Sequence, residues 1–340
     1  MKKLLLLIFI LTLIIVGCAQ EPASQPSEEE PAVEAEVEEE EEPAEESSFP
    51  ERPIEFVASY APGGGHDTLM RTMLKIIQDE GISDASINVV NKPGGSGAVG
   101  MAYVNGHAGD GHYLMAATSS LITTPLTSDV GLTFRDLTPI ARLGIDPELL
   151  LVNAESDYET LDDLINAGKV LNIGGTSTGG IEHIAAIKLQ IIAGVDINYI
   201  PYQGDGEVVA ALMGNQIDMV FTNPNSAIDY IKSGDFRPIA ITTEERVDLM
   251  PDIPTFKELG YDIVVNIYRG VMAPGGVSDE VVAYYTNMIE ELVATEEWQK
   301  DYIERNLIVE GYLPGEEFGE YLEEVYLLYE ETLTELGLIK

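Results

Sequence analysis

The fold is decided by residues 54–80, which read IEFVASYAPGGGHDTLMRTMLKIIQDE. The first seven residues form a mostly apolar run, typical of a buried strand, and the last thirteen have the periodicity of an amphipathic helix. A glycine-rich turn, Ala61 to Asp67, joins the two segments. A strand that passes through a tight turn into a helix indicates an α/β fold.

The same unit recurs along the chain, because runs rich in Val, Ile and Leu alternate with amphipathic stretches. This alternation predicts mostly parallel sheets flanked by helices, and the length allows two domains. We expect further strands at 87–91, 113–117, 149–152, 170–174, 197–199, 218–221 and 239–241. We expect further helices at 98–105, 158–167, 181–193, 206–213 and 226–233, and three more between 279 and 336 with a break at 311–315.

The N-terminal sequence is typical of an export signal. Two lysines precede the apolar run from Leu4 to Val16, which is too short to span a bilayer. The run ends in Ile-Val-Gly-Cys, a pattern read by lipoprotein signal peptidase. We therefore expect residues 1–17 to be a signal peptide and Cys18, the only cysteine, to be lipidated and to anchor the protein to a membrane. An ordinary secretory signal with an incidental cysteine is the alternative.

An acidic segment follows this cysteine. Residues 19–48 contain thirteen glutamates and no Lys, Arg or aromatic residue, so we predict a disordered spacer over 18–51. The whole chain has a formal net charge of −41, and residues 49–340 still carry −30. This excess argues against nucleic acid as a partner. We expect an extracytoplasmic protein, at the cell surface or in the periplasm.

Residues 95–100 fit the pattern GxGxxG between a predicted strand and a predicted helix. This pattern suggests dinucleotide binding when it follows the first strand of such a fold. Here it follows the second strand, and no acidic residue ends a strand about 20 positions later, where a ribose would need one. We predict no cofactor.

Residues 175–179 fit the pattern GxSxG, which is the setting of a nucleophile elbow. In that fold a histidine follows the nucleophile at a distance, whereas the last histidine, His183, lies on the helix that the elbow would begin. An exported serine hydrolase that uses Ser177 is kept as an alternative, and we do not expect an enzyme. The histidines show no metal-ligand spacing, so we predict no metal site.

Three turns after predicted strands are rich in glycine and hydroxyl residues: 62–67, 119–120 and 176–180. In open α/β sheets ligands bind at the carboxyl ends of the strands. Glycine lets backbone N–H groups approach a ligand, hydroxyl groups donate hydrogen bonds, and helix N-termini favour negative charge. Such turns facing one another would bind a small anion without Lys or Arg. Each could also be only a tight connection.

Nine blocks of sequence, in this order, resemble the substrate-binding proteins of tripartite tricarboxylate transporters, the Bug-type receptors. The resemblance runs from about residue 52 to the C-terminus, and the last of these blocks ends at residue 274. The blocks are RPIEFV (52–57), APGGGHD (61–67), NKPGGSG (91–97), DGHY (110–113), GTSTGGIEH (175–183), YIPYQG (199–204), GNQID (214–218), PDIPT (251–255) and YRGVMAP (268–274).

The resemblance implies a two-lobed fold of the type II periplasmic-binding-protein kind, with mostly parallel sheets and a ligand cleft between the lobes. It implies a monomeric lipoprotein receptor that captures a small carboxylate and delivers it to permease subunits in the membrane. A stand-alone carboxylate sensor is the alternative within this fold. The implied ligand-binding residues are Pro62, Gly63, Gly64, Gly65, His66, Asp67, Ser119, Ser120, Thr176, Ser177, Thr178, Gly179, His183, Gln203, Thr222, Asn223 and Arg269.

By the same resemblance, lobe one comprises 52–150 plus 270–340 and lobe two comprises 151–269, and they close on the ligand about a hinge. Gln203 stands where lysine is common in these receptors, which leaves the group at the distal end of the ligand open. Arg269 could bind a carboxylate in bidentate fashion or could pack at the hinge.

Overall fold

The structure is a computed structural model. The predicted signal peptide and Cys18 lie outside the described residues, as do Ser177 and Gln203. Phe49, which falls inside the predicted spacer, already packs against the rings of His112, Tyr284 and Tyr285. The structure describes residues 49–340 except 177, 203–204, 336 and 340.

Six strands form the first sheet, in the order β11-β4-β10-β3-β1-β2. β1 pairs in parallel with β2 and β3, whereas β10 pairs antiparallel with β3 and β4, and β11 antiparallel with β4. The strands are β1 (Ile54–Ala58), β2 (Ile87–Asn91), β3 (Tyr113–Ala117), β4 (Leu137–Pro147), β10 (Asn266–Pro274) and β11 (Val309–Pro314).

Five strands form the second sheet, in the order β7-β6-β8-β5-β9. β6 pairs in parallel with β7 and β8, and β5 pairs antiparallel with β8 and β9. The strands are β5 (Leu149–Asn153), β6 (Leu171–Gly175), β7 (Ile197–Pro201), β8 (Met219–Thr222) and β9 (Phe236–Ile241).

Helices cover both faces of each sheet, and for this reason strands such as β3 (YLMAA) and β5 (LLLVN) are buried along their whole length. The α-helices are α1 (Gly65–Asp79), α2 (Ala98–Asn105), α3 (Ser120–Thr127), α4 (Leu161–Ile165), α5 (Ile181–Ala193), α6 (Asp205–Met213), α7 (Pro224–Ser233), α8 (Asp279–Val293), α9 (Glu296–Trp298) and α10 (Gly315–Glu335). Short 3₁₀ segments, η1 (Gly95–Gly97) and η2 (Phe134–Asp136), and a π-helix, η3 (Gln299–Glu304), complete the set.

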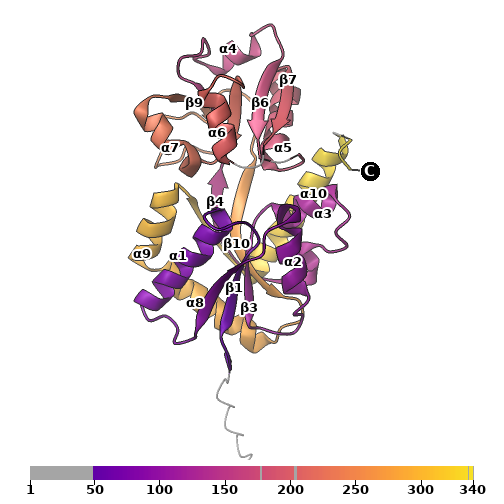
Figure 1. Ribbon diagram of the computed structural model, residues 1–340, viewed down its shortest axis with the longest axis vertical. Coiled ribbons are helices and arrows are strands. Elements are labelled where there is room, and N and C mark those ends of the chain that lie inside the picture. Colours follow the sequence, from indigo (N-terminus) through magenta and orange to yellow (C-terminus); the bar gives the residue numbers. More distant parts are fainter. Residues whose placement is uncertain (1–48, 177, 203–204, 336, 340) are drawn as a thin grey trace, which may run out of the picture. The chain divides into compact units, whose positions relative to one another are not determined.

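We call the first sheet with α1, α2, α3, α8, α9 and α10 the first lobe, and the second sheet with α4 to α7 the second lobe (Figure 1). Alternation along β1 shows how the first lobe is packed. Phe56 belongs to the cluster formed with α1 and α8, whereas Val57 belongs to the cluster formed with α2, α3 and α10. Successive side chains of a strand point to opposite faces, so one apolar strand supports two layers of helices.

The prediction of mostly parallel sheets was wrong, because both sheets are mixed. Each antiparallel pair contains at least one strand of the set β4, β5, β9, β10 and β11. Of these, β4, β10 and β11 were not predicted, and the expected helix break at 311–315 falls largely within β11. The parallel strands belong to strand–helix–strand units, in which apolar runs alternate with amphipathic stretches along the sequence. The unpredicted strands pair with segments that are remote along the chain.

The chain passes from the first sheet to the second at Glu148 and returns through residues 242–265 to β10. The two crossings are tied together. Glu148 N–H donates to Thr242 Oγ1 (2.9 Å), and Thr242 N–H donates to the Glu148 carbonyl oxygen (3.0 Å). Both residues are fully buried, so these hydrogen bonds fix two adjacent connections between the lobes.

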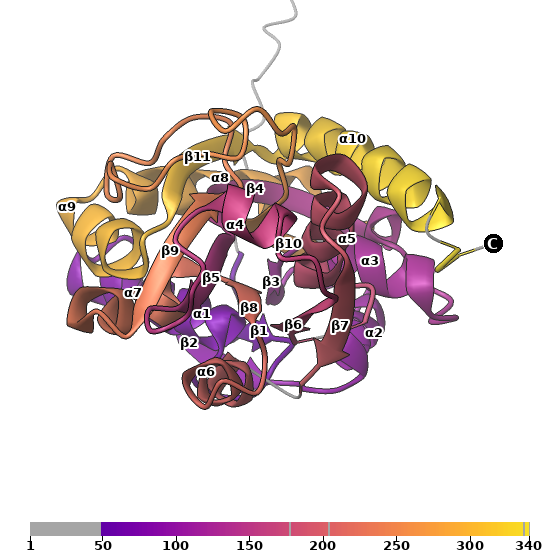
Figure 2. The same cartoon turned by 90° about the horizontal axis from the view of Figure 1, so that it is seen from above.

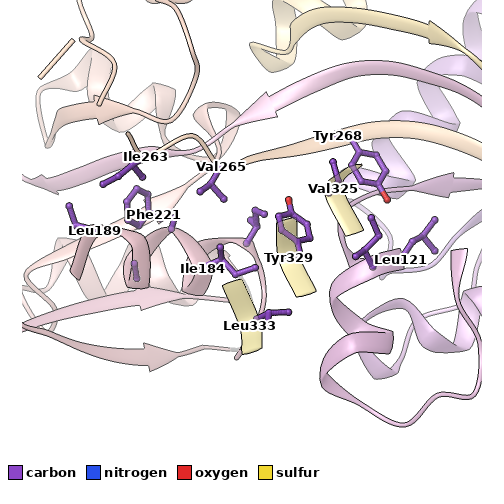
Figure 3. Close-up of a cluster of buried hydrophobic side chains, with 14 of the residues drawn as sticks. Leu121, Ile184, Leu189, Phe221, Ile263, Val265, Tyr268, Val325, Tyr329 and Leu333 are labelled. Atoms are coloured by element: carbon purple, nitrogen blue, oxygen red, sulfur yellow. The ribbon is translucent and has the colours of Figure 1, made fainter. Parts of the chain in front are cut away.

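One apolar cluster continues from the first lobe into the second. It joins Tyr329 and Leu333 of α10 with Ile184 of α5 and Phe221 of β8 (Figure 3). Viewed from above, α5 and α10 lie next to each other (Figure 2). The C-terminal helix therefore contributes apolar contacts that hold the lobes in the observed arrangement.

Candidate functional site

Asp67 holds the loop at residues 61–64, which we call the first loop, against the first sheet. Its carboxylate accepts hydrogen bonds from Gly63 N–H (2.8 Å), from Arg71 Nε (2.9 and 3.0 Å) and from Asn91 Nδ2 (2.9 Å). Burial alone would raise the pKa of Asp67, but these hydrogen bonds, first those from Arg71, outweigh it and lower the pKa. The geometry therefore gives Asp67 a positioning role.

Replacing Asp67 with Asn should lower the free energy of unfolding by about 2 kcal/mol, because the charge-assisted bond from Arg71 is lost and a buried group is left mispaired. Urea unfolding at pH 7 measures the change. The matched control is Asp79→Asn at the end of the same helix. Asp79 pairs with Lys75 at an exposed site (3.3 Å), and its loss should cost less than about 1 kcal/mol. Equal losses in the two variants would contradict the role given to Asp67.

The first turn of α1 offers backbone donors beside the first loop. The helix begins at Gly65, and its N-cap, Gly64, has no side-chain cap hydrogen bond. The first N–H groups of a helix have no partner within the helix, and they carry its partial positive charge. Anions bind readily at such helix ends. The N–H groups of Gly65 and His66 are therefore suited to a carboxylate.

His66 points from α1 into the first lobe, where a row of hydroxyl groups begins. Its Nε2 lies 3.0 Å from Thr118 Oγ1, which in turn lies 3.1 Å from Ser120 Oγ. Burial, and to a lesser degree the positive charge of Arg269, lowers the pKa of His66 to about 3. The ring is therefore neutral at pH 7, and it orients the hydroxyl groups at the end of β3.

Arg269 is held by a carboxylate of the neighbouring strand. Its guanidinium binds Asp146 through Nε (3.1 Å) and through Nη2, and both side chains are buried. The guanidinium also lies against the backbone of Gly65, where a Cβ atom would come within 2.6 Å of Nη1. Arg269 was predicted either to bind a ligand carboxylate or to pack at the hinge. These contacts favour packing at the crossing between the lobes.

A cavity of about 10 Å³ lies beside Arg269. Its lining includes Thr68 of α1 and Asn225 of α7, so elements of both lobes meet here. A cavity of this size admits about one water molecule. Anything larger than a water molecule could therefore enter this cavity only if the lobes separated at this place.

The second lobe contributes the turn at residues 176–180, which we call the second turn. Thr176 Oγ1 donates to Glu182 Oε1 (2.6 Å), and Gly179 N–H donates to His183 Nδ1 (2.9 Å). The His183 ring stacks on Tyr199 at 4.1 Å, and burial lowers its pKa. Residues of the first turn of α5 therefore shape this turn.

Thr222 and Asn223 end β8 and begin α7. The Asn223 amide donates to the Pro147 carbonyl oxygen and to Glu148 Oε1, both at 3.1 Å. Thr222 Oγ1 is buried and has no hydrogen-bond partner within the part of the chain that the structure describes. Asn223 thus braces the crossing between the lobes, and Thr222 has a hydroxyl group free for a further contact.

The two lobes bring several predicted site residues together. A Cβ atom at Gly179 would lie 2.8 Å from Thr127 Cγ2, so the second turn touches α3 of the first lobe. Ser119 is the N-cap of α3, and Tyr329 of α10 donates to its hydroxyl at 3.5 Å. Pro62 and Thr178 are exposed, and among the described residues neither forms a hydrogen bond with another predicted site residue.

Four further polar residues at the site were not predicted: Tyr60, Thr118, Asp146 and Glu182. Tyr60 packs its ring on His66 at 4.7 Å, and Thr118 connects His66 to Ser120. Tyr60 and Thr118 directly precede predicted site turns, and their position could have indicated them. The sequence did not indicate Asp146 and Glu182, because in a chain with many acidic residues a buried carboxylate cannot be told from one at the surface.

The GxSxG pattern gains no support as a nucleophile elbow, although Ser177 itself lies outside the described residues. His183 Nδ1 is occupied by Gly179 N–H of the same turn, so that nitrogen does not face a triad acid. Among the described residues no group of three or more His, Cys, Asp or Glu side chains could hold a metal ion. In the same residues no helix is both long and apolar enough to cross a membrane.

Comparison with known proteins gives a family match over most of the chain. Residues 78–304 match the model of the tripartite tricarboxylate transporter family receptor. The protein BugT of Bordetella pertussis is 29% identical over 256 residues, which cover 72% of this chain and 77% of BugT.

Solved structures agree with this match. A TctC solute binding protein from Polaromonas is 27% identical, with a TM-score of 0.72, and the superposition covers 84% of this chain and 99% of that protein. A protein of R. palustris solved with adipate has a TM-score of 0.77 at 22% identity, covering 85% and 98% of the two chains, and this likeness concerns the fold alone.

Proposed function

This chain belongs to the family of tripartite tricarboxylate transporter receptors, and we propose that it captures a small carboxylate outside the cytoplasm and delivers it to a membrane permease. Members of this family are solute-binding receptors and not enzymes, as the sequence predicted. The observation that carries the proposal is the meeting of the first lobe with the second turn at Thr127 and Gly179. A ligand held by donors of both lobes gains most when the lobes close.

The ligand carboxylate would bind at the start of α1. The N–H groups of Gly65 and His66 and the hydroxyl groups of Ser119 and Ser120 are the donors on the first lobe. All of them are neutral, and charge-assisted hydrogen bonds to a carboxylate are about twice as strong as neutral ones. The bound carboxylate would therefore be stabilised without a lysine or arginine at the loop.

The second lobe would close over the other end of the ligand. Thr176 and the second turn are its donors, and Thr222 adds a buried hydroxyl group. Ser177 and Gln203 belong to this proposed set by sequence only. We place the hinge at the paired crossings, Glu148 and Thr242, because short connections of this kind absorb the rotation in two-lobed binding proteins.

The remaining parts of the proposal concern the cell envelope. Lipidated Cys18 would anchor the receptor, and residues 18–51, apart from the packed end at Phe49, would act as a leash. A monomer tethered near its permease meets it at a high effective concentration. A R. palustris protein of this fold was solved with adipate, and this supports a small carboxylate as the ligand here.

The proposal predicts a ligand-dependent gain in stability. In a panel of mono-, di- and tricarboxylates, at least one acid at 100 times its Kd should raise the free energy of unfolding of residues 49–340 by about 2.7 kcal/mol. Ser120→Ala should reduce that gain, whereas Ser233→Ala, an exposed serine at the end of α7, should not. Thermal or urea unfolding with and without each acid measures the effect. A panel that leaves the stability unchanged would overturn the proposed function.

A further inference from the structure

A buried carboxylate, Glu182, forms part of the second lobe's side of the proposed site. It lies in the first turn of α5 and is only 8% exposed. Thr176 of the second turn donates to its Oε1 at 2.6 Å. A Cβ atom at Gly175 would lie 2.9 Å from the Glu182 Cβ, so the side chain starts directly beside the backbone that leads into this turn.

Tyr60 and Ser120 lie side by side on the first lobe. Their hydroxyl groups are neighbours, since a Cβ atom at Gly97 would lie 3.3 Å from Ser120 Oγ and 3.4 Å from the Tyr60 hydroxyl. Burial raises the pKa of Tyr60, and the negative charge of Glu182 raises it further. Glu182 is bonded through Thr176 to the second turn, which reaches the first lobe at Thr127, and its effect on Tyr60 agrees with this placement.

The cations at the first loop are already engaged by other carboxylates. Arg71 binds Asp67, and Arg269 binds the fully buried Asp146. The donors left for the ligand on the first lobe are backbone N–H groups and hydroxyl groups, which carry no net charge. Glu182 adds a carboxylate at the second-lobe end of the site, where Thr176 donates a hydrogen bond to it.

A ligand with a second carboxylate would bring like charges together in a water-poor space, which is unfavourable. A ligand with an ammonium group would instead form a charge-assisted hydrogen bond to Glu182. We propose that Glu182 makes this receptor select small carboxylates that also carry an ammonium group. This inference rests on the proposed function and names the substrate class of the same site.

Pairs of ligands that differ only by an ammonium group in place of a hydrogen atom test the proposal. Suitable pairs are aspartate with succinate and glutamate with glutarate, each titrated calorimetrically into residues 49–340. In at least one pair the amino acid should bind the wild-type protein at least 10-fold more tightly than its partner. Glu182→Gln should reduce that ratio at least 10-fold, by weakening the amino acid and strengthening the dicarboxylate.

Two variants serve as controls. Glu182→Asp keeps the charge and should keep the preference, and it remains informative if Glu182→Gln fails to fold. Glu331→Gln removes one exposed charge from α10 and should leave both affinities unchanged.

The outcomes separate this inference from the proposed function. If the wild-type protein binds the dicarboxylates as tightly as the amino acids, the selectivity is wrong and the receptor function stands. If Glu182→Gln weakens both ligands of a pair equally, Glu182 is only structural and the inference is overturned. If no ligand of any pair and no acid of the wider panel binds, the receptor function itself fails, and the inference fails with it.

Discussion

Lowering the pH from 7 to 4 should reduce the stability of this protein by about 3 kcal/mol through His66 alone. Burial next to Arg269 lowers the pKa of His66 to about 3, whereas the side chain has a pKa of about 6.5 in the unfolded chain. The unfolded state therefore binds a proton between these two values and the folded state does not. Each pH unit within this window costs up to about 1.4 kcal/mol.

The sign of the effect follows from the direction of the shift. Because folding lowers this pKa, the stability from His66 is fully present above pH 6.5 and is lost as the pH falls toward 3. His66→Gln removes the titrating group and keeps a polar atom near Thr118. Urea unfolding of both proteins at pH 7, 6, 5 and 4 isolates the contribution, because all other groups titrate in both.

The wild-type protein should lose about 3 kcal/mol more than His66→Gln over this range. Parallel pH profiles of the two proteins would mean that the pKa of His66 is similar in the folded and unfolded states. In that case burial beside Thr118 would not keep the ring neutral below about pH 6.5.

The strand, turn and helix predicted at residues 54–80 are all present, but the start of the helix differs from the prediction. The helix begins at Gly65, three residues before the predicted start at Thr68. Glycine is a poor helix former, so the sequence favoured a loop there. Asp67 overrides this preference, because its hydrogen bonds to Gly63 and Asn91 fix the turn and its ion pair with Arg71 supports the helix.

The strands that were missed lack the local pattern on which such predictions depend. β11 contains Gly311 and Pro314, which read as a break, and its pairing with β4 is interrupted between Glu310 and Leu313. β4 and β10 pair along their whole lengths although they are more than a hundred residues apart in sequence. They are strands because of their tertiary partners, and no local alternation of apolar and polar residues predicts such a pairing.

The glycine and hydroxyl clusters of the candidate site could be predicted from the sequence, whereas its buried charges could not. Asp146 and its partner Arg269 are 123 positions apart. Glu182 is one of many acidic residues, and its meaning depends on its burial beside Thr176. Burial of an individual charge is a property of the packed fold, so a single sequence does not reveal it.

Replacing Arg269 with Leu should lower the free energy of unfolding by 3–5 kcal/mol, roughly the cost of leaving a buried carboxylate without its charged partner. Asp146 is fully buried and Arg269 is 8% exposed, so water does little to compensate. The matched control is Arg135→Leu. Arg135 pairs with Glu323 at the surface, where both side chains are more than 40% exposed, and its loss should cost less than about 1 kcal/mol.

The double variant Arg269→Leu/Asp146→Leu separates loss of the pair from loss of packing. An apolar pair of similar volume often replaces a buried ion pair at little cost, so the double variant should recover most of the lost stability. Urea unfolding at pH 7 measures all four proteins. If Arg269→Leu costs no more than Arg135→Leu, Asp146 is satisfied by other groups and the guanidinium is free to bind a ligand. The packing role at the crossing between the lobes would then be wrong, and Arg269 would return to the proposed binding site.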